Sequence, residues 1–435
     1  MDADGLNSAS RGGAGWARWL PWVAACLVGV GIPVFVAMVR TLGRNIPQPG
    51  IELDYMAGVL WAAALALVIS VLPLPPGDRK ALLVLWGAKC FVTLGFMLLY
   101  EYSYGLDAYM YFTESLRYGK PQADESLGGG TEVIAVLAWY HNWILPDSYH
   151  ALKVSCSMVG LVAVYFSYRA ALLYRPSIGT RLLYFLGLFP SVLFWSSVLG
   201  KDPIVLLGIS LYGFGVMGWA QRRRAVYFIP LLAGVWVAAT IRLWLGPILL
   251  LPLVVVALRE VRGTAGRLAV LAGVGVVVGS IVSAFRAKLS IYALEDLYRT
   301  TEVLTDALAG STPNPEVQFT GIGSMIAFLP QGAFRALFRP LPGEVMNPFG
   351  LLAGFENLFL LALVALAAVR ITRAKLGEPM VQWALAVIVC WAGVYSFVSA
   401  NMGAAVRFKL QVLPTLLCLL LYLSSRRSEE ETAAH

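Results

Sequence analysis

Ionisable side chains lie at the ends of long apolar runs in this sequence, where burying a charge costs free energy. The cations of this set are Lys201, Arg242, Arg407 and Lys409, and the carboxylates are Asp107, Asp202 and Glu356. Arg and Lys are the usual protein partners of phosphate, and Arg adds a bidentate geometry. A nearby carboxylate can accept a proton from an attacking hydroxyl. The set therefore predicts chemistry at a phosphate ester, with a hydroxyl group as the acceptor.

Two of the carboxylates also allow a purely structural explanation. Asp202 precedes Pro203, and this pair suits the start of a helix, because Asp is a good N-cap and Pro fits the first helical position. Asp107 could cap a helix that begins at Ala108 in the same way. Both explanations stay open beside the chemical one.

The late members of the set differ in how well structure alone explains them. Arg407 and Lys409 could be interfacial anchors at the start of a membrane span. Glu356 lies about two turns inside a predicted span, where a charge costs roughly 2.5–3.5 kcal/mol on insertion scales. A lone carboxylate at that position favours a functional role.

The composition indicates a membrane protein. Of 435 residues, 59% are hydrophobic and only 13% are charged, whereas soluble proteins carry about 25% charged residues. Long apolar runs recur from end to end, so we expect a polytopic protein. The net charge of +8 is interpreted as a signal of membrane orientation, which argues against nucleic acid as a partner.

No pattern predicts a metal or a cofactor. The cysteines all fall in apolar runs and are Cys26, Cys90, Cys156, Cys390 and Cys418. They are expected to be buried small hydrophobes without a disulfide framework. The three histidines lack metal-ligand spacing, and no glycine-rich phosphate loop is present. We therefore predict no metal site and no cofactor.

The predicted fold is an all-α, polytopic transmembrane bundle. A span needs about 20 apolar residues, and we count about twelve candidates. They are 20–39, 54–74, 81–100, 149–173, 182–197, 203–220, 226–241, 244–258, 268–284, 349–369, 381–399 and 410–424.

The basic residues predict the orientation. Short Arg-rich connections occur at 174–181, 221–225, 259–267 and 370–380. Under the positive-inside rule these are cytoplasmic, and both termini are then inside. The resulting organisation is a disordered tail (1–18), a transmembrane domain (19–424) with long outer loops at 101–148 and 285–348, and a cytoplasmic tail (425–435).

The two outer loops contain amphipathic segments. The stretches 107–119, 287–309 and 324–338 place apolar residues on one side at helical spacing. Such segments are typical of helices that lie in the headgroup layer of a membrane. We therefore expect interfacial helices in both loops, on the same side as the charged set.

Four stretches carry a resemblance to a known class of proteins. They are "GLDAYMYF" (105–112), "PSVLFWSSVLGKDPIVLLGISLYGFG" (190–215), "LFRPLPGEVMNPFGLLAGFEN" (337–357) and "AVRFKLQVLPTLL" (405–417). They resemble, in the same order, segments of polytopic membrane proteins of bacterial exopolysaccharide assembly. Such proteins are similar to GT-C glycosyltransferases and to the polymerases that join lipid-linked repeat units.

The resemblance implies a function and a location. The chain would be a glycosyltransferase or polysaccharide polymerase in the bacterial inner membrane. Its partners would be a polyprenyl-phosphate-linked or polyprenyl-pyrophosphate-linked sugar donor, a hydroxyl acceptor on a glycan or lipid, and the surrounding membrane lipid. The reaction would take place on the extracytoplasmic face.

This function gives each residue of the set a role. Asp107 is the predicted general base, with Glu356 its rival. Tyr109 and Tyr111 would stack on sugar or pack against lipid. The donor phosphates would be held by the cations Lys201, Arg242, Arg407 and Lys409, which also stabilise the leaving group, and Asp202 is counted with them as a substrate-binding residue.

Two other classes of function fit parts of the sequence. A transporter or flippase of a lipid-linked or anionic substrate is the main alternative, although transporters tend to place polar residues at mid-depth and to show repeated halves. The other alternative is a non-catalytic assembly scaffold, in which no single charge of the set would matter.

Overall fold

The part of the chain that the structure describes is built from helices. In this computed structural model the described residues are 20–103, 107–116, 129–261, 263–289, 321–398 and 402–425. No strand occurs among them, so the all-α prediction is confirmed for these ranges. The predicted tail 1–18, the predicted tail 425–435 except Ser425, and most of the predicted helix at 287–309 lie outside the described residues.

The first half of the described chain ends with the long helix α10. Its helices are α1 (Leu20–Leu42), α2 (Ile51–Val71), α3 (Pro76–Cys90), α4 (Met97–Ser103), α5 (Asp107–Ser115), α6 (Gly130–Ile144), α7 (Tyr149–Tyr174), α8 (Arg181–Leu188), α9 (Pro190–Trp195) and α10 (Lys201–Arg222). A π-helical turn, Phe91–Phe96, joins α3 and α4 into one rod.

The second half contains shorter pieces as well as long rods. Its helices are α11 (Phe228–Ile241), α12 (Leu245–Leu250), α13 (Leu253–Glu260), α14 (Thr264–Leu289), α16 (Ile322–Phe338), α17 (Pro348–Arg370), α18 (Arg373–Gly377), α19 (Pro379–Val398), α20 (Met402–Lys409) and α21 (Leu413–Ser424). A 3-10 turn, Ala225–Tyr227, precedes α11. The predicted interfacial segment 324–338 forms most of α16.

Within the described ranges, six helical segments are long and apolar enough to cross a membrane. They are α2, the α3–α4 rod, α7, α10, α17 and α19, and the bent pair α20–α21, with a 68° angle, would be a seventh. This supports a multi-pass membrane protein, but with fewer full-length spans than the twelve expected. The predicted spans 182–197 and 244–258 are each divided into two short helices. In each span the first helix ends two residues before a proline, which is Pro190 in one and Pro252 in the other. Proline restricts the residue before it and lacks an N–H donor, so such breaks are expected there.

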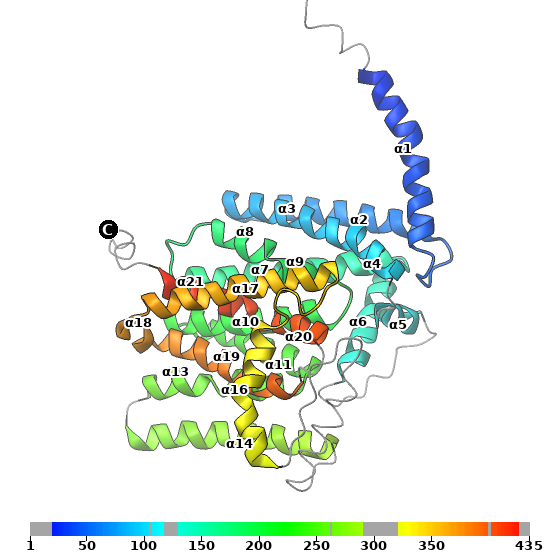
Figure 1. Ribbon diagram of the computed structural model, residues 1–435. Coiled ribbons are helices and arrows are strands. Elements are labelled where there is room, and N and C mark those ends of the chain that lie inside the picture. The colour runs from blue at the N-terminus through cyan, green and yellow to red at the C-terminus, as the bar shows by residue number, and fades with distance from the viewer. Residues whose placement is uncertain are drawn as a thin grey trace, which may run out of the picture.

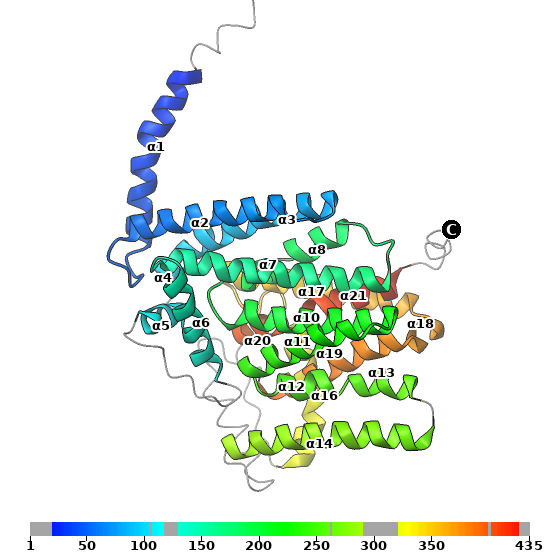
Figure 2. The ribbon, with the colours of Figure 1, turned by 180° about the vertical axis from the view of Figure 1, so that it is seen from behind.

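The long helices share one direction, and two others cross it. Figure 1 and the view from behind in Figure 2 show α2, α3, α7, α10, α17 and α19 lying roughly side by side. α16 runs across this bundle, as an interfacial helix would, and α1 extends away from the body. α10 is central, because it packs on both α7 and α11.

Glycines bring the backbones of α10 and α11 into contact. A Cβ atom at Gly234 would lie 2.4 Å from both the Gly208 carbonyl oxygen and the Tyr212 amide nitrogen. On the facing helix, a Cβ at Gly215 would lie 2.5 Å from the Leu231 nitrogen. Small residues of this kind allow close packing of helices in membranes, where apolar burial does not distinguish protein from lipid.

A buried turn between α9 and α10 sets the position of the charged residues. Lys89, in α3, donates to the Ser196 carbonyl oxygen at 2.8 Å and to the hydroxyls of Ser196 and Ser197 at 2.6 and 3.1 Å. Thr93 donates to the Ser197 carbonyl oxygen at 2.9 Å. A Cβ at Gly160 of α7 would lie 1.9 Å from the Ser196 oxygen. The chain therefore reverses inside the protein, directly before Lys201.

The α10–α11 contact gives a test of the fold. Gly234→Val should destabilise the protein by at least the roughly 1–3 kcal/mol of an overpacked core, because the clash is with backbone atoms. Thermal unfolding of detergent-purified protein measures the effect. Gly393→Val in α19 is the matched control, because a Cβ there meets nothing within 4 Å. Equal melting temperatures for the two variants would contradict this packing.

Candidate functional site

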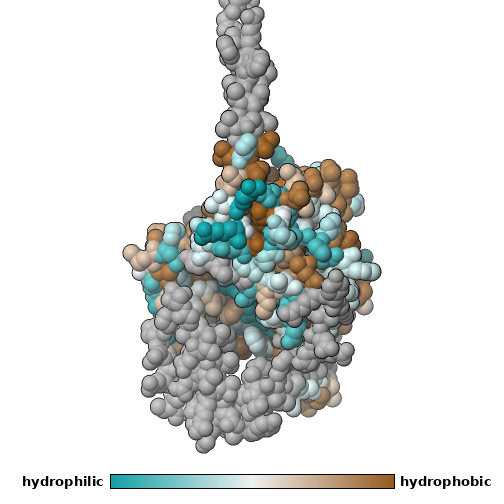
Figure 3. All heavy atoms as spheres, turned by 90° about the vertical axis from the view of Figure 1, so that its right-hand side faces the viewer, coloured by the Kyte–Doolittle hydropathy of each residue, from teal (hydrophilic) through white to brown (hydrophobic). Residues whose placement is uncertain are grey.

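A cavity lies beside the start of α10 and collects several of the charged residues. Its volume is about 190 Å³, and α4, α5, α9 and α20 contribute to its walls together with the turn before α10. Its polar lining includes Glu101, Asp107 and Arg407, and its aromatic lining includes Tyr100 and Trp195. Figure 3 faces the end of the molecule that carries α5 and α6, and it shows hydrophilic residues gathered between hydrophobic flanks.

Asp202 is the centre of an ion cluster behind this cavity. Its carboxylate is 3% exposed and accepts a hydrogen bond from Arg407 Nε at 2.5 Å. Its other oxygen lies 3.9 Å from a terminal nitrogen of Arg242. One carboxylate thus joins helix α10 to α20 and to the end of α11, three segments that are far apart in the sequence.

Aromatic rings hold the two arginines of the cluster. The Arg242 guanidinium lies 4.1 Å from the centre of the Phe408 ring and donates to the Tyr395 hydroxyl at 3.1 Å. The Arg407 guanidinium lies 5.7 Å from the centre of the Trp195 ring. Because Arg stacks on aromatic faces, these contacts fix the direction of each guanidinium as well as its charge.

Lys201 completes the cluster on the side of α6. Its ammonium donates to the Thr131 hydroxyl at 2.7 Å and is subject to the charges of Arg242, Arg407, Asp107 and Asp202. Three cations and one buried carboxylate, Asp202, leave the cluster with a net charge of +2 by simple addition. Such a group favours a multiply charged anion over a neutral ligand.

Asp107 differs from Asp202 in its exposure and in its partners. It is the first residue of α5, it is exposed, and it lines the same cavity as Arg407. Its carboxylate makes no hydrogen bond or ion pair with the residues that the structure describes. A carboxylate that keeps its proton-accepting oxygens unoccupied beside a cationic wall suits a general base.

The two tyrosines of α5 are placed differently from each other. Tyr111 is 1% exposed, and its hydroxyl approaches Thr131 without a well-aligned hydrogen bond. Burial, together with the charge of Asp107, raises the pKa of Tyr111 to about 12, so the hydroxyl keeps its proton at neutral pH. Tyr109 donates to the Glu101 carbonyl oxygen at 3.1 Å. Both rings therefore pack within the protein, and the expected stacking on a sugar stays a prediction.

Glu101 is a cavity residue that the sequence did not single out. Its buried carboxylate lies 2.8 Å from the ammonium of Lys153 and accepts a hydrogen bond from Tyr149 at 2.8 Å. Both partners belong to α7, so this buried ion pair ties the end of the α3–α4 rod to α7 beside the cavity. Its only signal in the sequence was a carboxylate at the end of an apolar run.

Glu356 and Lys409 form a separate buried pair away from the cavity lining. The Lys409 ammonium lies 3.5 Å from one Glu356 oxygen and also donates to Asn357, while the other Glu356 oxygen accepts from the Ser191 amide at 2.8 Å. Lys409 is completely buried, so it does not act as an interfacial anchor. The pair connects α17, α20 and the start of α9.

The structure thus brings together most, but not all, of the predicted set. Asp107 and Arg407 line one cavity. Lys201, Asp202 and Arg242 cluster with Arg407 beside it, and Tyr111 is buried close to this cluster. Asp202 is not the N-cap of α10, because that position is Gly200 and the Asp lies in the first turn. Within the described ranges, no group of three or more His, Cys, Asp or Glu side chains could hold a metal ion.

Comparison with known proteins identifies no relative. No family model, no curated protein and no solved structure matches this chain. The resemblance to exopolysaccharide-assembly proteins therefore stays a prediction from four short motifs, and any function has to be argued from the cavity itself.

The contrast between the two carboxylates can be tested by stability. Asp202→Asn should destabilise the protein by about 3–5 kcal/mol, because it leaves the buried Arg242 and the half-buried Arg407 without their carboxylate. Asp107→Asn should leave stability within about 0.5 kcal/mol, since the residue is exposed and unpaired in the described structure. Thermal unfolding in one detergent measures both variants. A reversed order would show that Asp202 does not organise the site.

Proposed function

We propose that this protein is a membrane glycosyltransferase or polysaccharide polymerase that uses a polyprenyl-phosphate-linked or polyprenyl-pyrophosphate-linked sugar donor. The observation that carries the proposal is a single cavity lined both by Asp107, a carboxylate without a partner among the described residues, and by Arg407 of a cationic cluster. This is the arrangement that a reaction between a hydroxyl and a phosphate-bearing donor requires: a proton acceptor at one edge and an anion site at the other.

The proposed reaction can be written with these residues in defined roles. The acceptor hydroxyl oxygen forms a bond to the anomeric carbon of the donor sugar, and its proton passes to Asp107. The bond from that carbon to the donor phosphate oxygen breaks, and the electron pair stays on the phosphate. Arg407 and Lys201 stabilise the charge of this leaving group, and Arg242 adds to the field from behind. No metal or nucleotide is needed for this scheme.

Asp202 would be a positioning residue in this scheme. It accepts a hydrogen bond from Arg407 and lies within ion-pair distance of Arg242. A carboxylate in this place holds the guanidinium groups near each other, although they repel, and leaves donor N–H groups of Arg407 for the phosphate.

The proposed location is the bacterial inner membrane, with about twelve membrane-crossing or partly crossing segments and both termini inside. Two features support this orientation. The Arg-rich connections that follow α7, α10, α13 and α17 belong to one end of the bundle, and the cavity lies toward the other (Figure 1). The short pairs α8–α9 and α12–α13 would then each serve as one broken segment.

Loss of the proposed base should abolish most of the activity. Asp107→Asn keeps the shape of the side chain but removes the proton acceptor, so transfer should fall by about 100-fold or more. Arg407→Lys keeps the charge but loses the planar fork, and should also reduce transfer strongly. The measurement is surface polysaccharide in a producing strain that carries only the variant copy, with equal protein level verified by immunoblot.

Asp147→Asn is the matched control for that experiment, because Asp147 is an exposed carboxylate outside the cavity lining. It should retain full activity. Wild-type polysaccharide from Asp107→Asn would remove Asp107 from the role of base. If lipid-linked sugar crossed the membrane normally in vesicles but no sugar transfer took place even with the wild-type protein, the alternative of a flippase would replace the enzyme proposal.

The orientation can be tested independently of activity. A membrane-impermeant maleimide added to intact cells should label Asp147→Cys and leave Ser177→Cys unlabelled, because these exposed residues flank α7 at its two ends. Both variants should label after the cells are opened. The wild-type protein, whose described cysteines are buried or partly buried, sets the background. Labelling of Ser177→Cys in intact cells would reverse the proposed orientation.

A further inference from the structure

A second cavity lies within the bundle, near the Arg-rich ends of its helices. Its volume is about 220 Å³, and α7, α10, α19 and α21 form its walls. Tyr174 and Arg175 at the end of α7, together with Tyr422 near the end of α21, border one end, and Gln411 just before α21 borders the other. This cavity shares no lining residue with the one beside Asp107.

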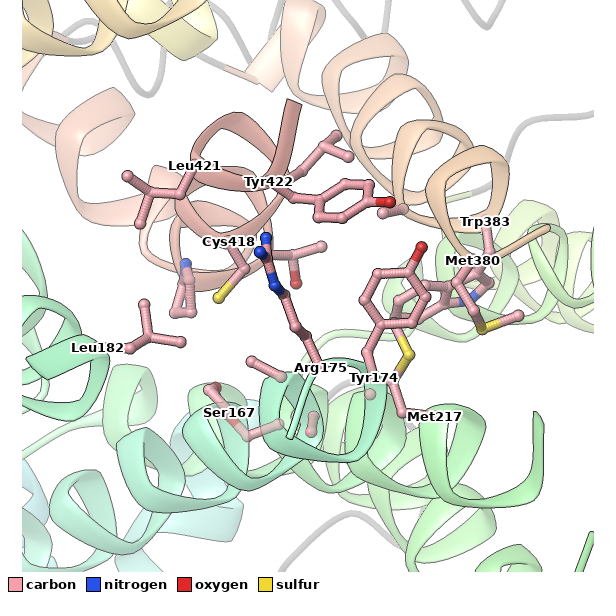
Figure 4. Close-up of a pocket in the computed structure, with 18 of the residues that line it drawn as sticks. Ser167, Tyr174, Arg175, Leu182, Met217, Met380, Trp383, Cys418, Leu421 and Tyr422 are labelled. Carbon is pink, nitrogen blue, oxygen red and sulfur yellow. The ribbon is translucent and has the colours of Figure 1, made fainter. Parts of the chain in front are cut away.

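Arg175 directs a cation into this cavity without a matching anion. Figure 4 shows its side chain reaching from the end of α7 toward Cys418 of α21, beside Tyr174. Among the described residues, the Arg175 side chain donates one hydrogen bond, to the Ser177 hydroxyl at 3.3 Å. No Asp or Glu is among the lining residues, and Glu378 accepts a hydrogen bond from Tyr422 without pairing with Arg175. A half-buried guanidinium that reaches into a cavity without a carboxylate in its wall suits an anionic ligand.

Gln411 provides an unsatisfied donor at the other end. Its side-chain oxygen accepts from the Trp391 indole at 2.9 Å, which fixes the orientation of the amide. The amide nitrogen is then left with no partner among the described residues, although Gln411 is only 3% exposed. A buried N–H group of this kind needs an oxygen acceptor from an occupant of the cavity.

The walls between these two polar ends suit a single hydrocarbon chain. They are apolar over most of their length, including Leu206, Ile209 and Met217 on α10. From Leu206 to Met217 the helix rises by roughly 16 Å at 1.5 Å per residue. The volume of about 220 Å³ is smaller than the ~300–1,000 Å³ of pockets for drug-sized ligands. One narrow chain fits such a space, whereas a lipid with two chains does not.

We propose that this cavity is a binding site for a single-chain amphiphile with an anionic head at Arg175 and an oxygen acceptor at the far end, next to Gln411. The chemical class is a carboxylate or phosphate of a hydrocarbon chain that carries a terminal hydroxyl. The site is independent of the proposed glycosyl transfer, because it is separate from the Asp107 cavity. It binds such a ligand whether or not the chain is an enzyme.

The experiment measures equilibrium binding of radiolabelled ω-hydroxydodecanoate to the full chain in phosphatidylcholine nanodiscs, with empty nanodiscs subtracted. Wild-type protein should bind it saturably. Dodecyl phosphate should compete if phosphate is the preferred head group, and neutral dodecanol should compete about tenfold more weakly or less, because it cannot pair with Arg175. Absence of saturable binding by the wild-type protein would overturn the proposal.

Three variants locate the ligand. Arg175→Gln should weaken binding about tenfold or more, whereas Arg181→Gln, the same change at an exposed arginine of the same connection, should have no effect. Gln411→Leu should erase the preference for ω-hydroxydodecanoate over dodecanoate. Gly213→Leu should abolish binding by filling the cavity, since a Cβ there already lies 3.8 Å from the Trp383 ring.

Equal affinities of Arg175→Gln and Arg181→Gln for ω-hydroxydodecanoate would show that the ligand binds elsewhere and would contradict the proposal. A melting temperature close to that of the wild type is required of Gly213→Leu before its result counts. If that variant does not fold, the comparison of the two arginine variants still decides, because both positions lie in the connection after α7 and neither is buried.

Discussion

The buried carboxylate of Asp202 is the contact on which the rest of the site depends. It brings two arginines, Arg407 and Arg242, from distant parts of the chain to the first turn of α10. Without an anion between them, three cations would repel one another in a space largely closed to water, where that repulsion is strong. The positions of Lys201, of α20 and of the end of α11 therefore follow from one carboxylate.

The same principle recurs elsewhere in the bundle. Glu101 with Lys153, Glu356 with Lys409, and Asp54 with His150 are buried pairs that each join helices from different parts of the chain. Pairs of this kind contribute little net stability but are expensive to break, so they define which helices meet and in which register. Elsewhere in the bundle, glycine contacts such as those between α10 and α11 bring helices together without charge.

How much of this could be predicted from the sequence depends on the residue. The meeting of Asp107, Lys201, Arg242 and Arg407 followed from the orientation rule, because all four were assigned to the same side. The sequence did not predict that Glu356 and Lys409 lie apart from these four residues. The orientation rule predicts the depth of a residue in the membrane, but not the position of its helix within the bundle.

Other features depended on contacts that no local pattern reveals. Glu101 was counted as the beginning of a loop because its partner, Lys153, lies far away in the sequence. The count of about twelve spans is not confirmed among the described residues, because hydropathy does not register where a proline interrupts an apolar run, as Pro190 and Pro252 do here.

The buried turn before α10 has a consequence for how the cavity can change shape. The Lys89 ammonium donates all of its described hydrogen bonds to that turn, so a displacement of Ser196 or Ser197 would break several of them simultaneously. The wall of the cavity formed by the turn before α10 is therefore held firmly in place. Asp107 lines the same cavity from α5, where it is exposed and unpaired among the described residues. A ligand that reaches Asp107 would therefore have to fit the shape that the turn before α10 sets.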